Sequence, residues 1–293
     1  MKKFYGTGVA LVTPFNEKLE IDFKSLKRLL NYTSKGVDYY VVMGTTGEAV
    51  TIHDDEKREV LAFVKKNNPK KLPIVFGIGS NDTQHALECI SKTDFNGVDA
   101  ILSVSPYYNK PSQEGIYQHF KKIADQCPVP VILYNVPGRT GSNITAETTL
   151  RLAGHQNIVA TKEASGSLEQ CMNIVKHKPN DFLLLSGDDM LTVPLYSIGS
   201  KGVISVLANA FPSVFNKMKV FAFDNKFEKA RREQFRILEI NGPMYEEGNP
   251  VGVKYLLSKM GICDAYTRLP MASASERLRK KIDDIYDTLK RKG

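Results

Sequence analysis

Eight short apolar runs, most of them rich in β-branched residues, recur along this chain and constrain its fold more than any other feature. Their starts lie roughly 20 to 35 residues apart, and helical patterns fill most of the intervals. Strands that are apolar on both faces and alternate with helices are typical of a parallel sheet. The runs are VALVT (9–13), YYVVMG (39–44), PIVFGIG (73–79), AILSVS (100–105), PVILYNV (130–136), NIVATKE (157–163), DFLLLSG (181–187) and GVISVLA (202–208).

Eight such strands within about 210 residues predict a (β/α)8 TIM barrel of the α/β class. The alternative is a doubly wound open sheet, which usually carries a glycine-rich dinucleotide motif after its first strand. Here the first run leads into TPFN (13–16), and the chain contains no Walker A sequence. We therefore predict a barrel over residues 1–208.

Residues 209–293 are expected to add helices to this barrel. Helical patterns lie around 213–224, 226–240, 250–260 and 273–290. No linker separates them from the strands, so we expect the last barrel helix followed by a C-terminal helical extension. This extension would pack on the barrel and would not form an independent domain.

The chain is basic, with 40 Lys and Arg against 32 Asp and Glu and a formal net charge of +8. Proteins that bind nucleic acids concentrate positive charge on one face and add a recognisable motif. Here basic residues are mixed with acids, as in EKRE (56–59), and the densest cluster, 277–292, has the apolar spacing of an amphipathic helix. We expect no nucleic-acid partner, and the charge favours small anionic substrates.

The cysteines and the first residues indicate a cellular compartment. The cysteines lie far apart, with no CxxC pair and no Cys/His cluster, which predicts reduced and mostly buried thiols. Glycines and a proline interrupt the first apolar stretch, so we expect neither a signal peptide nor a membrane span. A cytoplasmic location without a membrane partner follows as the expectation. The cysteines are Cys89, Cys127, Cys171 and Cys263.

The sequence contains no motif that supports a metal site or a serine hydrolase. The five histidines form no ligand spacing such as HExxH, and Asp188 and Asp189 have no visible partner ligands. No G-x-S-x-G elbow occurs. We therefore expect no metal and no serine nucleophile.

Lys162 is the most unusual polar residue among the strand ends, where barrel enzymes place their chemistry. It stands inside an apolar run, where a hydrated ammonium is unfavourable to bury unless it is neutral or paired. A neutral lysine amine is a nucleophile toward carbonyls, which predicts a Schiff-base lysine. The alternative is a strand-end lysine that faces solvent or pairs with Glu163 or Asp188.

Hydroxyl groups and an arginine follow other strands. Tyr134, Tyr108 and Thr45 end three strands, and such hydroxyls can transfer protons, although packing with a hydrogen bond to backbone is the alternative. Thr45 and Thr46 offer hydroxyls and N–H groups to a carboxylate, or else cap a helix through Thr-x-x-Glu. Arg139 can clamp a substrate carboxylate or lie on the surface.

These residues belong to motifs that resemble one family. The strings GTTGE (44–48), SPYYNKPSQEG (105–115), YNVPGRTG (134–141), KEASG (162–166) and LSGDD (185–189) are similar to those of the dihydrodipicolinate synthase (4-hydroxy-tetrahydrodipicolinate synthase) family. The resemblance covers essentially the full length, and the motifs are specific in combination. It places the chain among Schiff-base lyases and aldolases built on (β/α)8 barrels.

The resemblance implies condensation of pyruvate with L-aspartate 4-semialdehyde, in lysine and diaminopimelate biosynthesis. Lys162 would form an imine with pyruvate, and Tyr134 would be the central acid and base. Thr45 would link Tyr134 to Tyr108, which in the family reaches into the neighbouring subunit. No cofactor is implied, because the lysine itself is the electron sink.

The same resemblance implies binding roles and an assembly. Thr46 would hold the pyruvate carboxylate, Arg139 would bind the semialdehyde carboxylate, and main-chain groups of Gly187 and Ile204 would line the site. A shared site requires a homo-oligomer, and the family is commonly a tetramer built as a dimer of dimers.

Two other functions remain as alternatives. N-acetylneuraminate lyases and 2-keto-3-deoxy sugar acid aldolases share the lysine and tyrosine, but they generally lack an arginine at the position of Arg139. Sialate lyases also carry Ser-Thr where Thr45 and Thr46 stand. A non-catalytic barrel that only binds an oxo acid would be expected to lose the nucleophile or the proton relay, and this chain keeps both.

Many family members bind the inhibitor lysine at a subunit interface, and this chain departs from their pattern. Lysine-sensitive members usually place Glu at the position of His85, and Lys57 stands where some relatives have His. An added cation and a lost acid disfavour a cationic ligand, so we expect weak or no lysine inhibition. The corresponding positions are Ala49, Asp54, Lys57, Asn81, His85 and Tyr107.

Overall fold

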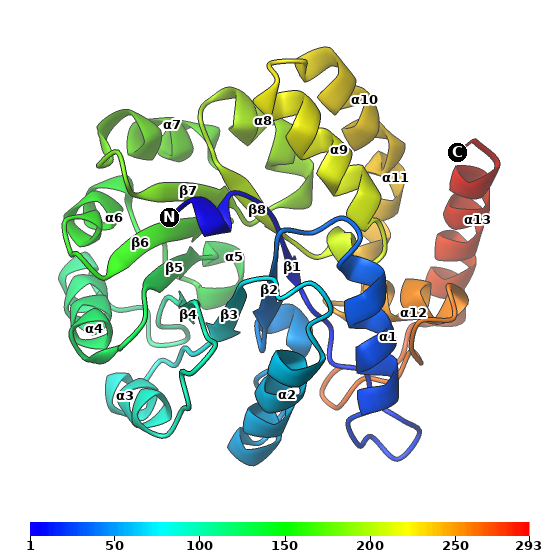
Figure 1. Ribbon diagram of the computed structural model, residues 1–293, viewed down its shortest axis with the longest axis horizontal. Coiled ribbons are helices and arrows are strands. Elements are labelled where there is room, and N and C mark those ends of the chain that lie inside the picture. The colour runs from blue at the N-terminus through cyan, green and yellow to red at the C-terminus, as the bar shows by residue number, and fades with distance from the viewer. Residues whose placement is uncertain (293) are drawn as a thin grey trace.

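The computed structural model describes residues 1–292, and its centre is a closed barrel of eight parallel strands in the order β1 to β8 (Figure 1). The predicted TIM barrel is confirmed. Seven strands lie within the predicted apolar runs. The strands are β1 Gly6–Ala10, β2 Tyr39–Val42, β3 Ile74–Gly77, β4 Ala100–Val104, β5 Val131–Asn135, β6 Ile158–Glu163, β7 Leu183–Ser186 and β8 Gly202–Ser205.

Helices surround this barrel in a ring (Figure 1). Their apolar faces pack on the strands, so most of the hydrophobic core lies between the two layers. They are α1 Phe23–Thr33, α2 Asp54–Asn67, α3 Thr83–Ser91, α4 Gln113–Gln126, α6 Ala146–Ala153, α7 Leu168–His177, α8 Thr192–Ser197 and α9 Pro212–Phe223, whereas the four-residue helix α5 Pro137–Thr140 follows β5 inside the ring. Short 3-10 helices are η1 Lys2–Phe4, η2 Thr45–Gly47, η3 Asp189–Leu191, η4 Leu207–Asn209 and η5 Gly242–Met244.

The first strand, Gly6–Ala10, begins and ends earlier than the apolar run 9–13 predicts, and it includes Gly8. A Cβ atom on Gly8 would lie 2.1 Å from the ring of Tyr39, so only glycine leaves room for this ring inside the barrel. The Tyr39 ring in turn packs edge-on against Phe4, with ring centroids 5.7 Å apart. A glycine that looks like a strand breaker therefore accommodates an aromatic core residue.

Four helices follow the barrel, namely α10 Phe227–Arg236, α11 Leu238–Asn241, α12 Val251–Lys259 and α13 Glu276–Lys292. The helix expected over 226–240 is divided at Ile237, whose backbone leaves the helical region while its side chain is buried. Helix α13 lies at the edge of the molecule and packs on α12 through the buried residues Leu278 and Ile282 (Figure 1).

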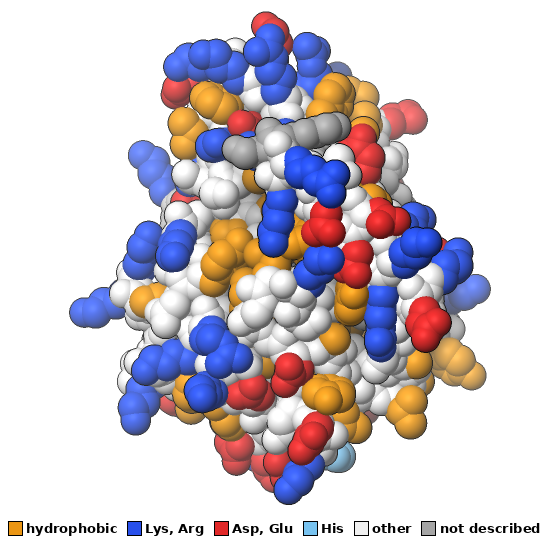
Figure 2. Space-filling model, turned by 90° about the vertical axis from the view of Figure 1, so that its right-hand side faces the viewer, with side chains coloured by type: hydrophobic (Ala, Val, Ile, Leu, Met, Phe, Trp, Pro, Cys, Tyr) orange, Lys and Arg blue, Asp and Glu red, His pale blue; other side chains and the backbone are white. Residues whose placement is uncertain are grey.

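The charged residues on the face that α13 occupies are mixed in sign. Figure 2 shows Lys and Arg spread over this face with acidic side chains among them. Many of these charges are paired, such as Lys259 with Asp283 at 2.9 Å and Lys281 with Glu246 at 2.7 Å. Across residues 1–292, no helix is both long enough and apolar enough to span a membrane.

Candidate active site

Lys162 and Tyr134 lie side by side inside the barrel, near the carboxyl ends of β6 and β5. The two residues are register partners on neighbouring strands, and alternation points both side chains inward. Lys162 Nζ lies 4.0 Å from the centroid of the Tyr134 ring, and the two residues are only 5% and 6% exposed. The strands thus hold an amine against a phenol in a site largely closed to water.

Neither alternative for Lys162 describes the structure. The carboxylate of Glu163 points to the other face of the strand, where it accepts hydrogen bonds from Asn135 Nδ2, Gln170 Nε2 and the N–H of Ser165. Asp188 accepts from the N–H of Met190. Within residues 1–292 no carboxylate forms an ion pair with Lys162, and the side chain does not face solvent.

Gly187 and Ile204 complete this end of the barrel. A Cβ on Gly187 would lie 2.7 Å from Ala164 Cβ and 3.2 Å from Lys162 Cε, so glycine lets the end of β7 approach the lysine. Ile204 is buried in the barrel interior, in register with Gly8. The structure therefore brings Gly187 next to Lys162 and places Ile204 in the barrel interior.

Thr45 and Thr46 occupy the short turn η2 that follows β2. The N–H groups of Gly47 and Glu48 are used inside this turn, whereas in residues 1–292 those of Thr45 and Thr46 donate to no protein acceptor. Thr46 is buried, and its Oγ1 accepts from Asn249 Nδ2 at 3.0 Å. The turn therefore presents two free N–H groups and two hydroxyls, which suits a carboxylate.

The alternative that Glu48 caps this turn through Thr-x-x-Glu does not hold, because Glu48 pairs with the C-terminal segment instead. Its buried carboxylate accepts from Lys254 Nζ at 2.5 Å and from the N–H of Arg268 at 3.0 Å. Lys254 also donates to the carbonyl oxygen of Tyr266. Burial lowers the pKa of Lys254, and the adjacent Glu48 opposes this shift.

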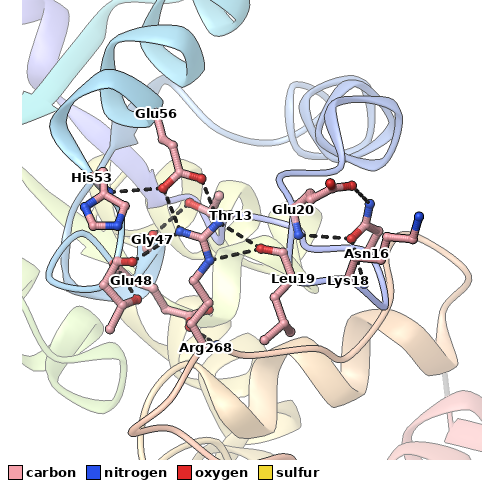
Figure 3. Close-up of polar contacts among 11 residues, drawn as sticks. Thr13, Asn16, Lys18, Leu19, Glu20, Gly47, Glu48, His53, Glu56 and Arg268 are labelled. Atoms are coloured by element: carbon pink, nitrogen blue, oxygen red, sulfur yellow. Dashed lines mark hydrogen bonds and ion pairs between the residues drawn. The ribbon is translucent and has the colours of Figure 1, made fainter.

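Arg268 extends the same network outward (Figure 3). Its guanidinium binds both oxygens of Glu56, at 2.6 and 2.7 Å, and donates to the carbonyl oxygen of Leu19. This contact lowers the pKa of Glu56. Sequence reasoning missed Asn249, Lys254 and Arg268, because no local pattern connects them with a turn about 200 residues earlier.

Tyr108 and Arg139 lie in the loops that follow β4 and β5 and are exposed. Tyr108 is 88% exposed and adopts a positive φ of 77°, which is an unusual conformation for a bulky residue. Its N–H donates to the carbonyl oxygen of Thr140 at 3.3 Å, which joins the loops that follow β4 and β5. Within one chain, neither side chain joins the buried group formed by Lys162 and Tyr134.

A cavity of about 320 Å³ extends from Tyr134 and Thr45 past Tyr107 to helices α2 and α3. It reaches five of the six positions associated with lysine binding, namely Ala49, Asp54, Lys57, His85 and Tyr107. The sixth, Asn81, does not line it, although its neighbour Ser80 does. One continuous space therefore connects the candidate catalytic residues with a cleft between two helices.

The cysteines and histidines also differ from expectation at one place. Cys127, Cys171 and Cys263 are buried and Cys89 is partly exposed, which agrees with the prediction of mostly buried thiols. Its Sγ lies 3.6 Å from Nε2 of His85, so the structure forms a Cys/His pair that sequence analysis overlooked. The i, i+4 spacing of the two residues on a predicted helix was the available signal.

Asp189 is another buried titratable group near Lys162. Its Oδ2 accepts from the N–H groups of Val206 and Leu207, directly after β8. Burial raises the pKa of its carboxyl to about 6 in spite of these bonds. Asp189 therefore anchors the backbone that follows Ile204.

Comparisons with known proteins agree along the whole chain. A model of the dihydrodipicolinate synthetase family matches residues 3–289. The 4-hydroxy-tetrahydrodipicolinate synthase of Cytophaga hutchinsonii is 50% identical over 287 residues, which are 98% of this chain and 97% of that protein. The synthase of Flavobacterium psychrophilum is 46% identical over 285 residues, 97% of each chain.

Solved structures give the same result. The chloride-inhibited dihydrodipicolinate synthase of Acinetobacter baumannii, solved in complex with pyruvate, matches with a TM-score of 0.95 at 35% identity. The match covers 98% of this chain and 99% of that one. The resemblance seen in the sequence motifs is thereby confirmed, and this chain belongs to the dihydrodipicolinate synthetase family of lyase enzymes.

Proposed function

We propose that this chain condenses pyruvate with L-aspartate 4-semialdehyde to 4-hydroxy-tetrahydrodipicolinate through a Schiff base on Lys162. The observation that carries the proposal is the contact between the Lys162 amine and the Tyr134 ring, at 4.0 Å in a buried site. A free amine next to a phenol can attack a ketone while the phenol supplies and accepts protons.

The reaction proceeds through covalent steps at Lys162. Its amine adds to the ketone carbon of pyruvate, and loss of water gives the imine. Loss of a methyl proton gives the enamine, whose carbon attacks the aldehyde and forms the new C–C bond. The amino group of the semialdehyde then attacks the imine carbon, closes the ring and releases the lysine. Tyr134, as the nearest acid and base, relays these protons.

The proposed binding groups fit two carboxylate substrates. Thr46 and the free N–H groups of η2 bind the pyruvate carboxylate, and Arg139 binds the carboxylate of the semialdehyde. The pyruvate complex of the Acinetobacter baumannii relative supports pyruvate as the first substrate. The net positive charge of +8 favours the approach of both anions.

Borohydride trapping tests the covalent step directly. The enzyme is reduced in the presence of pyruvate, and the digested peptides are weighed by mass spectrometry. We expect one pyruvate-derived adduct, located on Lys162, that is absent from Lys162→Arg. An adduct on another lysine, or none, would contradict the mechanism. Adding either aspartate semialdehyde or N-acetylmannosamine as second substrate then distinguishes the synthase from a sialate lyase.

We also propose that the active enzyme is a homo-oligomer in which Tyr108 serves a neighbouring subunit, in a tetramer made of two such dimers. The exposed, strained Tyr108 supports this assembly, because its side chain is largely uncovered by the described residues of its own chain. A cytoplasmic location is part of the same proposal.

Lysine is proposed to be a weak inhibitor at most. Lys57 and His85 both line the cleft, and Lys57 already pairs with Asp54 at 2.9 Å. A ligand ammonium would therefore meet one cation and a carboxylate that is already engaged. We expect half-inhibition above about 1 mM lysine. A lower value in a steady-state assay would refute this proposal.

A further inference from the structure

Three potential metal ligands meet in the cleft between α2 and α3, apart from the residues assigned to the reaction. Asp54 is the first residue of α2, and His85 and Cys89 lie one turn apart on α3. One ligand atom from each side chain lies within 4.8 Å of the other two. All three side chains line the cavity.

The distance between Cys89 and His85 fits tetrahedral zinc. Zinc binds thiolate at about 2.3 Å and imidazole at about 2.0 Å, so a tetrahedral site holds S and N about 3.5 Å apart. Cys89 Sγ and His85 Nε2 are 3.6 Å apart. The Asp54 carboxylate is exposed and can rotate about its own χ angles to close the third edge.

We propose that Asp54, His85 and Cys89 bind a Zn²⁺ ion, with a fourth position open to the cavity. A thiolate, an imidazole and a carboxylate are a donor set that zinc accepts, whereas magnesium and calcium prefer oxygen ligands alone. Binding releases the thiol proton of Cys89 to solvent as the Zn–S bond forms. The site does not depend on the proposed reaction.

Lys57 limits the affinity of this site without blocking it. Its Nζ contacts Asp54 Oδ1 at 2.9 Å, which leaves Oδ2 for the metal. The ammonium lies in the same cavity and repels a cation. We therefore expect micromolar affinity, and we expect Lys57→Met to tighten binding.

The cavity connects this site with the proposed catalytic residues. Asp54, His85 and Cys89 line the same space as Thr45 and Tyr134. A small anion on the fourth position of the zinc would therefore enter the space that leads to the barrel mouth.

Cobalt and zinc titrations of the reduced full-length protein test the site. We expect one Co²⁺ per chain, with a near-ultraviolet thiolate-to-cobalt charge-transfer band that Zn²⁺ abolishes by displacement. Removing a residue that only hydrogen-bonds to a metal ligand lowers metal affinity about 10–100-fold, and removing a ligand itself should cost at least as much. His85→Gln and Cys89→Ser should therefore each weaken Zn²⁺ binding by at least about tenfold. Cys89→Ser should also remove the band.

His177→Gln is the matched control, because His177 is an exposed histidine on another helix. It should leave the stoichiometry and the Zn²⁺ affinity unchanged. The inference is overturned if the wild type shows no charge-transfer band, if fewer than half of the chains bind Zn²⁺ at saturation, or if Cys89→Ser binds Zn²⁺ as tightly as the wild type.

Discussion

The two sides of the barrel mouth are held by different means. On one side, the turn that carries Thr45 and Thr46 is fixed by buried contacts with Asn249 and Lys254 and by a partly buried contact with Arg268, all from the C-terminal segment. On the other side, the loops with Tyr108 and Arg139 are exposed and tied mainly to each other. One half of the site is thus organised within a single chain, and we propose that the other half is completed by a second copy.

The difference teaches that the C-terminal helices have a role besides covering the barrel. Buried charged pairs lose much of their Coulomb energy to desolvation, so they contribute more to a defined geometry than to net stability. Glu48 and Lys254 fit this description, because both are almost fully buried and one lies directly after η2. The turn η2, which we propose binds the pyruvate carboxylate, is therefore positioned by a segment far away in the sequence.

Removing one partner of this pair should have the largest effect. Lys254→Met leaves the Glu48 carboxylate buried without its cation, which should lower the free energy of unfolding by about 3–5 kcal/mol. Urea denaturation measures this change. The surface variant Lys259→Met, which breaks a partly exposed pair with Asp283, should cost less than about 1 kcal/mol.

The double variant Glu48→Gln, Lys254→Met tests whether the loss comes from the unpaired charge. It should recover part of the stability that Lys254→Met loses, because no buried carboxylate remains. A double variant as unstable as the sum of the two single variants would contradict this explanation.

The free energy of unfolding should depend on pH through His119 of α4. This buried histidine bonds to Thr83 through Nδ1, and burial lowers its pKa to about 4. An unfolded histidine takes up its proton below about 6.5, so the unfolded state binds more protons between these values. The stabilising contribution of neutral His119 is therefore fully present above about pH 6.5 and is lost as the pH falls to about 4. Over this range the free energy of unfolding should decrease by roughly 3 kcal/mol in total.

Comparison with His119→Gln isolates this effect. Burial raises the pKa of Asp189 to about 6, so this carboxyl stabilises the folded state as the pH falls. It therefore partly masks the loss of stability that His119 causes. Because Asp189 is present in both proteins, the difference between their stability–pH curves reports His119 alone. Parallel curves for the two proteins would show that His119 does not titrate as described, and His177→Gln serves as an exposed control.

Tyr108→Phe tests whether the exposed side is completed by a partner. Loss of a positioned proton-transfer group should lower kcat about a hundredfold, while the thermal midpoint stays within about 1 °C because the side chain is largely exposed in its own chain. A midpoint that falls by several degrees would indicate a structural role instead.

Mixing subunits tests the shared site in a way that does not depend on the stability of either variant. Lys162→Ala and Tyr108→Phe chains, each nearly inactive, are dissociated together and allowed to reassemble. If Tyr108 serves the neighbouring site, half of the dimers are hybrids with one intact site, so activity should return to about a quarter of the wild type. Activity that does not rise above that of the separate variants would remove the proposal of a shared site.

The smallest effect is expected for the hydrogen bond from Asn249 to Thr46. Asn249→Ala should raise KM for pyruvate about fivefold and leave kcat nearly unchanged, because one neutral hydrogen bond contributes about 1 kcal/mol. In a double-mutant cycle with Thr46→Val, the second substitution should add little to the first. Fully additive effects would mean that the two side chains act separately.

Much of the fold and part of the candidate site could be predicted from local sequence. Seven strands coincide with the apolar runs because both faces of these strands are buried. Lys162 and Tyr134 could be predicted because strand-end polar residues in barrels converge on one face. The start of β1 at Gly6 and the break at Ile237 were not predicted, because glycine and a smooth helical pattern have no fixed meaning until their neighbours are known.

The sequence by itself determined the barrel, the spacing of its strands along the chain and the polar residues at the carboxyl ends of these strands. These features depend on patterns over a few residues. Tertiary structure alone decided which groups meet: Asn249 with Thr46, Lys254 with Glu48, and Asp54 with His85 and Cys89. The physical reason is distance. Hydrogen bonds, ion pairs and metal ligation act over a few ångströms, and only the closed fold brings residues far apart in the chain within that range.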